Sequence, residues 1–253
     1  MPAPSSVRIL DQRTADERGR PFLPGMGRTW LLPLYDLFSR TSGVLALHRR
    51  AVELAGVAPG QSVLDVGCGT GNLSLAVLSA SPEARVTGLD PDGSALRRAA
   101  GKARRRRVSL TLLQGYADRL PAEDGSLDHV VSGFALHHLD DAGRSGFARE
   151  ALRVLRPGGR LTIVDFGDRP DADSPAGHGH GHAHAGRHLR GAVPRLVGPL
   201  VGRRGSRKLL GAAAGHGGAL VALLGDAGFG AARELEHADH QLGPISFVQA
   251  TRG

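Results

Sequence analysis

The chain has 253 residues, which suits one large α/β domain with an appendage, and its single cysteine excludes an intrachain disulfide and an all-cysteine metal site. Hydrophobic residues make up 41% of the sequence but aromatic residues only 4%, so we expect a core of Leu, Val and Ala. The net charge of +8 is compatible with an anionic partner, yet Arg is abundant throughout, and nucleic-acid binding is not favoured. No apolar run has the length of a signal peptide or a membrane span, so a cytoplasmic location is expected.

The first part of the chain is predicted to be a leader followed by a flap. Residues 1–28 carry scattered Pro and Gly and are expected to be flexible, whereas residues 29–60 are expected to form a helical flap. Within the flap, residues 30–39 are apolar and aromatic, and they either pack on the core or close over a ligand. Residues 43–55 follow an amphipathic helical pattern, in which His48 is expected on the polar, exposed side.

The stretch VLDVGCGTGN, residues 63–72, organises the rest of the sequence. Its apolar start is typical of a buried strand, and three glycines at every second position then permit positive φ and a close approach of ligand to backbone. A helix is predicted from Asn72, and its first amide groups point at the same spot and favour a polar or anionic group. Asp65 precedes the first glycine, where it would oppose a pyrophosphate but suit an ammonium group.

Further strands are predicted at residues 85–90, 108–113, 129–132 and 160–166, separated by helical segments. The second strand ends at Asp90, at the position where nucleotide-binding folds place an acid that binds ribose hydroxyls. Capping the next helix is the alternative role of this aspartate.

The segment VLDVGCGTG resembles the first motif of the class I S-adenosylmethionine (SAM)-dependent methyltransferases. Residues 114–128 are similar to that family's adenine-binding turn, with Tyr116 in place of an acid, and LRPGGRLTIVD resembles its helix-to-strand turn. The resemblance implies a Rossmann-like α/β fold, with a seven-stranded sheet that is mostly parallel, an antiparallel last strand, and helices on both faces. It places the SAM-binding methyltransferase domain at residues 61–253.

The resemblance also implies a cofactor site. In this family the glycine turn holds the amino-acid end of SAM, and the later turns hold the ribose and the adenine. The expected SAM-binding residues are Asp65, Gly67, Cys68, Gly69, Gly71, Asn72, Asp90, Pro91, Ala117, Asp118, Ser132 and Phe134. Tyr35 and Asp36 match the family's "YD" pair in an N-terminal helix and are expected to contact the substrate.

Candidate catalytic residues follow the fourth predicted strand. His137 and His138 lie after its carboxyl end, where open α/β sheets bind ligands, and either could act as a general base toward a hydroxyl or a protonated amine. Both could instead be purely structural, because positioning alone can activate transfer from a sulfonium. His137 and Asp165, at the end of the fifth strand, are also candidate substrate contacts. No Asn-Pro-Pro-Tyr-type motif follows the fourth strand, which argues against methylation of nucleic-acid bases.

Residues 167–215 interrupt the pattern as a His/Arg-rich insertion between strands 5 and 6. Alternate histidines at His178, His180, His182 and His184 could bind Ni, Zn, Cu or Co, or form a polar loop that binds metals only adventitiously. A basic segment follows, interleaved with Leu and Val, and is expected to act as a lid.

The sequence therefore predicts a SAM-dependent methyltransferase acting on an O, N, S or C atom of a small molecule. Two alternatives stay open: a SAM-binding metal or metabolite sensor without catalysis, and a methyltransferase that meets RNA or a lipid surface through the basic insertion. The sequence does not distinguish a monomer from a homodimer.

Overall fold

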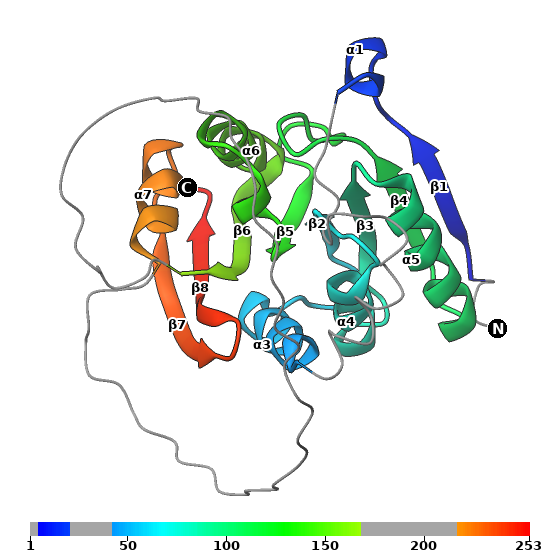
Figure 1. The fold of residues 1–253 in the computed structure, drawn as a ribbon, viewed down its shortest axis with the longest axis horizontal. Coiled ribbons are helices and arrows are strands. Elements are labelled where there is room, and N and C mark those ends of the chain that lie inside the picture. The colour runs from blue at the N-terminus through cyan, green and yellow to red at the C-terminus, as the bar shows by residue number, and fades with distance from the viewer. Residues whose placement is uncertain (1–4, 21–41, 168–216) are drawn as a thin grey trace, which may run out of the picture. The chain divides into compact units, whose positions relative to one another are not determined.

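The computed structural model describes residues 5–20, 42–167 and 217–253. Eight strands form one sheet in the order β1-β4-β3-β2-β5-β6-β8-β7 (Figure 1). Every neighbouring pair is parallel except the two pairs that involve β8, which is antiparallel to both β6 and β7. The strands are β1 Val7–Asp11, β2 Ser62–Val66, β3 Arg85–Asp90, β4 Leu110–Gln114, β5 Leu127–Gly133, β6 Leu155–Phe166, β7 Arg233–His240 and β8 Gly243–Thr251.

The predicted Rossmann-like α/β fold is confirmed, with one strand more than expected. The extra strand is β1, which pairs in parallel with β4, and the short helix α1 (Ala15–Arg18) follows it. The expectation of a flexible leader is therefore wrong for residues 7–18. The segment VRILD is too short to show a clear strand pattern in the sequence. In the structure, Val7 packs against the core and the strand is hydrogen-bonded to β4.

Alternate residues of the strands face two separate cores, as the period of a strand requires. Val63, Val86 and Val131 pack on one side with the helices α3 (Val44–Ala55), α4 (Asn72–Ala80) and α5 (Gly93–Arg106). On the other side, β-strand residues pack with α6 (Asp141–Val154) and α7 (Gly218–Asp226). Leu, Val and Ala dominate both cores, as the low aromatic content predicts.

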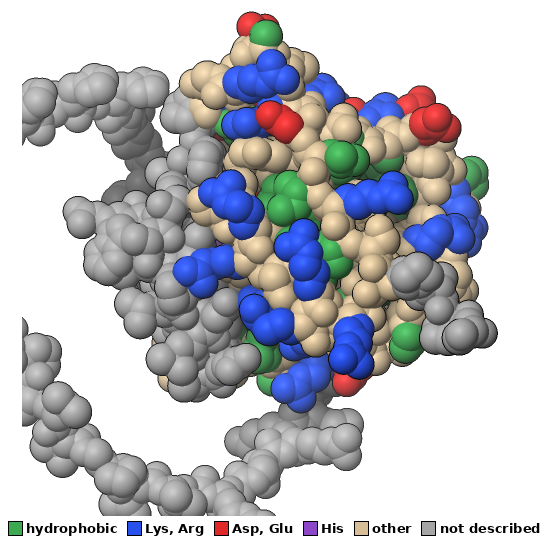
Figure 2. All heavy atoms as spheres, turned by 90° about the vertical axis from the view of Figure 1, so that its right-hand side faces the viewer, with side chains coloured by type: hydrophobic (Ala, Val, Ile, Leu, Met, Phe, Trp, Pro, Cys, Tyr) green, Lys and Arg blue, Asp and Glu red, His purple; other side chains and the backbone are tan. Residues whose placement is uncertain are grey.

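The face that carries α5 and β1 is strongly basic (Figure 2). The run Arg104–Arg107 closes α5 and is exposed, as expected for a solvated helix end, where arginines also complement the helix dipole. None of the described helices is both long and apolar enough to cross a membrane.

The strand order places the glycine turn at the point where the chain reverses its direction across the sheet. From β2 the chain builds outward through β3 and β4, and then returns to β5 on the other side of β2. Open α/β sheets bind ligands at this switch point, beyond the carboxyl ends of the strands. The short helix η2 (Leu136–His138) follows β5 at the same edge.

Candidate active site

A cavity of about 960 Å³ opens at this edge of the sheet. The ends of β2, β3 and β5, the η2 segment and α3 all contribute to its wall. Of the residues expected to bind SAM, the cavity is lined by Asp65, Gly67, Cys68, Gly69, Asn72, Asp90, Pro91, Ala117 and Phe134. The sequence motifs and this cavity therefore coincide.

The glycine turn is shaped by backbone geometry. Gly67, Gly69 and Gly71 all have positive φ, of 73°, 51° and 78°, which L-residues rarely adopt. A Cβ on Gly67 would lie only 2.3 Å from the Cβ of Ala135, whereas a Cβ on Gly69 would meet nothing within 4 Å. The turn is thus pressed against the η2 segment at one glycine and open at the next, which leaves room for a ligand.

Asp65 is a buried acid with one unused oxygen. Its Oδ2 accepts a hydrogen bond of 2.5 Å from the Ser74 hydroxyl, while its Oδ1 is buried and has no partner in the described structure. Burial raises the pKa of this carboxyl to about 7. Since the residue lines the cavity, a cationic or hydrogen-bond-donating ligand group there would satisfy the orphan oxygen.

Asp90 supports the turn from the neighbouring strand. Its two carboxylate oxygens accept hydrogen bonds of 2.8 Å from the backbone N–H groups of Gly69 and Asp92. Desolvation raises its pKa to about 6. Asp92, rather than Asp90, caps α5, which removes the alternative role considered for Asp90.

The adenine-type turn differs from the family pattern in its contacts. Asp118 forms an ion pair of 2.6 Å with Arg20 and does not belong to the cavity lining. Tyr116 does line the cavity; its hydroxyl donates to the Arg20 carbonyl oxygen, and the Arg20 guanidinium lies 4.7 Å from its ring centre. The segment after α1 therefore covers this end of the cavity.

Two expected SAM contacts are held by the protein itself. Ser132 is buried and donates its hydroxyl hydrogen bond to the carbonyl oxygen of Val66, away from the cavity lining. Gly71 serves as the N-cap position of α4 and also lies outside the lining. The Cys68 thiol lines the cavity but is buried, and burial raises its pKa well above the ordinary value, which suits a small packing residue rather than a nucleophile.

His137 lines the same cavity and forms a hydrogen-bonded pair with the buried Asp165. The His137 Nδ1 donates to Asp165 Oδ1 at 2.7 Å, so the Nε2 atom keeps a lone pair. Asp165, which the sequence suggested as a substrate contact, lies outside the cavity lining; it is buried and accepts hydrogen bonds from the N–H groups of Leu136, His137 and Phe166. Its role is to hold the imidazole ring in place.

His138 lies beside this pair and also lines the cavity. Its ring centre is 4.0 Å from that of His137. Burial, and then the neighbouring His137, lowers the pKa of His138, and no carboxylate orients its ring. His137 is therefore the better placed of the two candidate bases.

His48 was expected on the surface, and that expectation is wrong. It lies in α3 and is only 4% exposed, with its ring against Gly133 and Phe134. The signal was present in the sequence, since His48 follows Val44 by one helical turn and precedes Val52 by another, and both valines are buried. Its polar character led to the opposite assignment.

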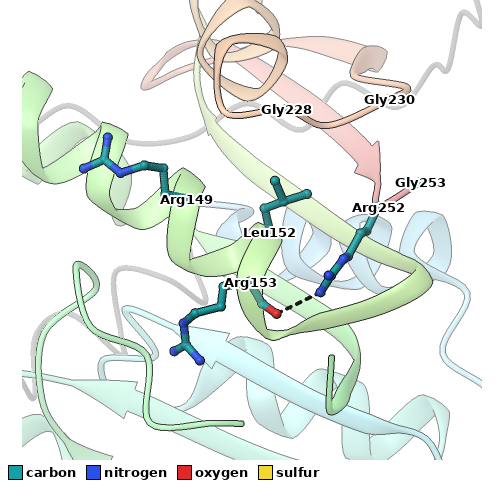
Figure 3. Close-up of a pocket in the computed structure, with 7 residues that line it drawn as sticks. All are labelled: Arg149, Leu152, Arg153, Gly228, Gly230, Arg252 and Gly253. Carbon is teal, nitrogen blue, oxygen red and sulfur yellow. Dashed lines mark hydrogen bonds between the residues drawn. The ribbon is translucent and has the colours of Figure 1, made fainter. Parts of the chain in front are cut away.

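A second, smaller hollow of about 390 Å³ lies between α6 and the C-terminal end of β8 (Figure 3). Its arginines are used inside the protein: Arg252 donates to the Arg153 carbonyl oxygen, and Arg153 pairs with Asp124 and Glu150. This hollow carries no candidate chemistry.

Several expected site residues lie outside the described residues, namely Tyr35, Asp36, His178, His180, His182 and His184. Among the residues that are described, no group of three or more His, Cys, Asp or Glu is arranged to hold a metal ion.

The parallel sheet, the glycine turn at its switch point and the acids Asp65 in β2 and Asp90 at the end of β3 are typical of a nucleotide-type α/β domain. Residues 63–159 match the family described as "Methyltransferase domain". Together with the fold, this match supports a class I SAM-dependent methyltransferase.

Curated relatives share the central part of the chain. A demethylmenaquinone methyltransferase of Thermus thermophilus is 35% identical over 143 residues, which cover 55% of this chain and 64% of that protein. A 27-O-demethylrifamycin SV methyltransferase of Amycolatopsis mediterranei is 39% identical over 126 residues, covering 48% and 45%. The chain thus spans less than two thirds of the length of these relatives. A SAM-dependent methyltransferase structure from Aquifex aeolicus shares the fold, with a TM-score of 0.54, 17% identity and coverage of 81% and 89%.

Proposed function

We propose that this protein transfers a methyl group from SAM to a small organic acceptor, with His137 as the general base. One observation carries the proposal: a single cavity is lined both by Asp65 and the glycine turn and by the His137 imidazole, which is hydrogen-bonded to Asp165.

The residues at the turn fit the donor. The unpartnered Asp65 oxygen would accept a hydrogen bond from the ammonium group, the open backbone at Gly69 would admit the ligand, and Asp90, which lines the cavity, would accept from the ribose hydroxyls. Pro91, Tyr116 and Ala117 would surround the adenine end. Bound SAM supplies a methyl group already activated by a positively charged sulfonium.

The protein's own contribution at the other end is to position the acceptor and to move a proton. With Nδ1 donating to Asp165, the His137 Nε2 can accept the proton of an acceptor hydroxyl as the O–CH₃ bond forms and the S–CH₃ bond breaks. Asp165 then stabilises the imidazolium, and S-adenosylhomocysteine leaves as the neutral thioether product. Phe134, Leu136 and Phe166 give this part of the cavity an apolar lining.

Small-molecule acceptors are supported by the enclosed, largely apolar cavity. The relatives' names identify two different acceptors, one a demethylmenaquinone and the other a demethylrifamycin, so they do not select the methylated atom in this chain.

Calorimetry with SAM and, separately, with NAD tests the donor. We expect SAM to bind and NAD not to bind; NAD binding without any response to SAM would overturn the proposal. Release of S-adenosylhomocysteine in the presence of a panel of small hydroxylated acceptors tests the reaction. SAM binding without turnover on any member of the panel would favour the non-catalytic sensor instead.

A further inference from the structure

Arg20 brings a cation from the first part of the chain to the donor cavity. It follows α1 by two residues and is one of the residues that line the cavity. It lies outside residues 63–159, the segment that matches the methyltransferase family, and none of the sequence motifs includes it. We call residues 7–20, which comprise β1, α1 and Arg20, the N-terminal arm; Figure 1 shows α1 beyond the end of β1, at the border of the sheet.

The N-terminal arm is fixed to the sheet and to the turn after β4. β1 pairs with β4 along its whole length, and just beyond β1 the Gln12 N–H donates to the Gln114 carbonyl oxygen at 2.9 Å. Arg119 then donates to both carboxylate oxygens of Glu17 in α1, at 2.8 and 2.7 Å. Because α1 is held on both sides in this way, the position of Arg20 is set by the fold and not by its own contacts alone.

Arg20 is in turn held at both its backbone and its side chain. The Tyr116 hydroxyl donates to the Arg20 carbonyl oxygen at 2.6 Å, and the Arg20 guanidinium lies 4.7 Å from the centre of the Tyr116 ring. The Arg20 Nη1 donates to Asp118 Oδ2 at 2.6 Å. Tyr116 stands where the family pattern has an acid, and both of its contacts with Arg20 need the phenol ring.

Asp118 is engaged by Arg20 and not by the cavity. The resemblance to the family assigns this carboxylate to the exocyclic amine of adenine, yet Asp118 lies outside the lining, whereas Arg20 belongs to it. In this chain the residue that the adenine end of the cavity presents to a ligand is therefore the guanidinium.

A guanidinium suits a purine base. It is planar, it stacks on aromatic and base faces, and its N–H groups can donate to the ring nitrogens of adenine, which are acceptors. Pro91, Tyr116 and Ala117 line the same part of the cavity, so a base there would lie among a ring, a proline and the backbone with the guanidinium beside it.

We propose that Arg20 contacts the adenine of bound SAM, and that Asp118 and Tyr116 are positioning residues that hold the guanidinium against the base. The N-terminal arm is then part of the donor site. This inference rests on the proposed function, because it assigns a further residue to the site that would bind SAM.

Calorimetry with S-adenosylhomocysteine as the probe tests the contact. Arg20→Ala should weaken binding by about tenfold, the loss expected when a group stacked on a base is removed. Arg20→Lys keeps the charge but not the plane, and should recover only part of this loss. Unchanged affinity in Arg20→Ala, or full affinity in Arg20→Lys, overturns the inference.

Arg18→Ala is the matched control. Arg18 is an exposed arginine of the same arm, it pairs with Asp11 at 3.7 Å, and it does not line the cavity. Its removal changes the net charge by the same amount as Arg20→Ala, and the affinity for S-adenosylhomocysteine should stay within about twofold of the wild-type value. A loss as large as that in Arg20→Ala would assign the effect to the charge of the arm and overturn the inference.

A double-mutant cycle tests the role of Asp118. Asp118→Asn alone should weaken binding less than Arg20→Ala does, because Tyr116 still holds the arginine. In the Arg20→Ala background the same substitution should cause no further loss, since Asp118 acts on the ligand only through Arg20. A larger loss in Asp118→Asn, or an additional loss in the double variant, would mean that Asp118 itself contacts the adenine and would overturn the inference.

The wild-type protein separates this inference from the proposed function. Failure of the wild type to bind SAM or S-adenosylhomocysteine would overturn the proposed function itself. Binding by the wild type with no change in the Arg20 variants would overturn this inference alone. Thermal unfolding without ligand shows that each variant is folded, and Arg20→Lys provides the test if Arg20→Ala is not.

Discussion

The two ends of the cavity are built in different ways. The donor end is made by a nearly continuous segment, residues 65–72, supported by Asp90 on the adjacent strand, and much of its shape comes from backbone geometry. The acceptor end is made by side chains from α3, β5, η2 and β6, which are far apart in the sequence. Local chemistry therefore specifies the donor end, while tertiary packing specifies the acceptor end.

The largest expected effect concerns the acceptor end. His137→Ala should lower the turnover of an acceptor found with the hydroxylated panel by about a hundredfold or more, the usual contribution of a general base, and leave SAM affinity unchanged. Turnover is measured as the rate of S-adenosylhomocysteine release, and SAM affinity is measured by calorimetry.

Asp165→Asn is the companion variant. It should lower turnover less than His137→Ala does, because the base remains but loses the carboxylate that orients it. Turnover unaffected by either substitution would mean that the histidine pair is structural and that positioning alone supplies the rate.

At the donor end, Asp65→Asn should weaken SAM binding by about a hundredfold, because a charge-assisted hydrogen bond to a buried group contributes up to about 3 kcal/mol. Ser74→Ala is the matched control, since it removes the internal hydrogen bond but keeps the carboxyl. Calorimetry measures both. A larger loss in Ser74→Ala than in Asp65→Asn would show that the charge of Asp65 is not what the donor site uses.

The pH dependence of SAM binding follows from the same carboxyl. Since the pKa of Asp65 is about 7 in the ligand-free protein, its charged form is lost as the pH falls through that value. Wild-type affinity should therefore rise between pH 6 and pH 8, and this rise should be smaller in Asp65→Asn. Equal slopes for the two proteins would assign the pH dependence to another group.

Another prediction tests the contact between Gly67 in the glycine turn and Ala135 before η2. Gly67→Ala should reduce the free energy of unfolding by about 3 kcal/mol, through the strain of positive φ and the close contact with Ala135. Adding Ala135→Gly should recover the part due to the contact. Gly69→Ala, which has positive φ but open space, should lose only about 1 kcal/mol. Denaturant unfolding without ligand measures all three, and no recovery in the double variant would contradict the packing argument.

The smallest effect is expected at Ser132. Ser132→Ala removes the hydrogen bond to Val66 and should reduce the free energy of unfolding by about 1 kcal/mol. SAM affinity should stay the same within about twofold in calorimetry, the change expected for a residue that does not touch the ligand. A tenfold loss of SAM affinity would instead show that Ser132 belongs to the donor site.

The sequence predicted the donor end well because its signals are local. The sequence alone shows three glycines, which permit positive φ, an acid before them and a second acid at the end of the next strand. The structure confirms the positive φ at all three glycines. The predicted sheet was correct apart from β1, which is short and depends on β4 for its hydrogen bonds.

The acceptor end could not be predicted in the same way. Asp165 was assigned to the substrate because it ends a strand, but the η2 backbone and His137 surround its carboxylate. His48 was assigned to the surface because histidine is polar, and only the packing of α3 against β5 buries it. Both errors concern contacts between segments that the chain brings together only when folded.

The additional strand β1 changes which strand forms the border of the sheet. Without it, β4, with the apolar sequence LTLLQ, would present its unpaired backbone groups at the border of the sheet and could pair with another chain. β1 takes the border position instead, and its five residues include Arg8 and Asp11, charges that oppose strand addition. A short segment outside the cavity lining thus covers the backbone edge of β4.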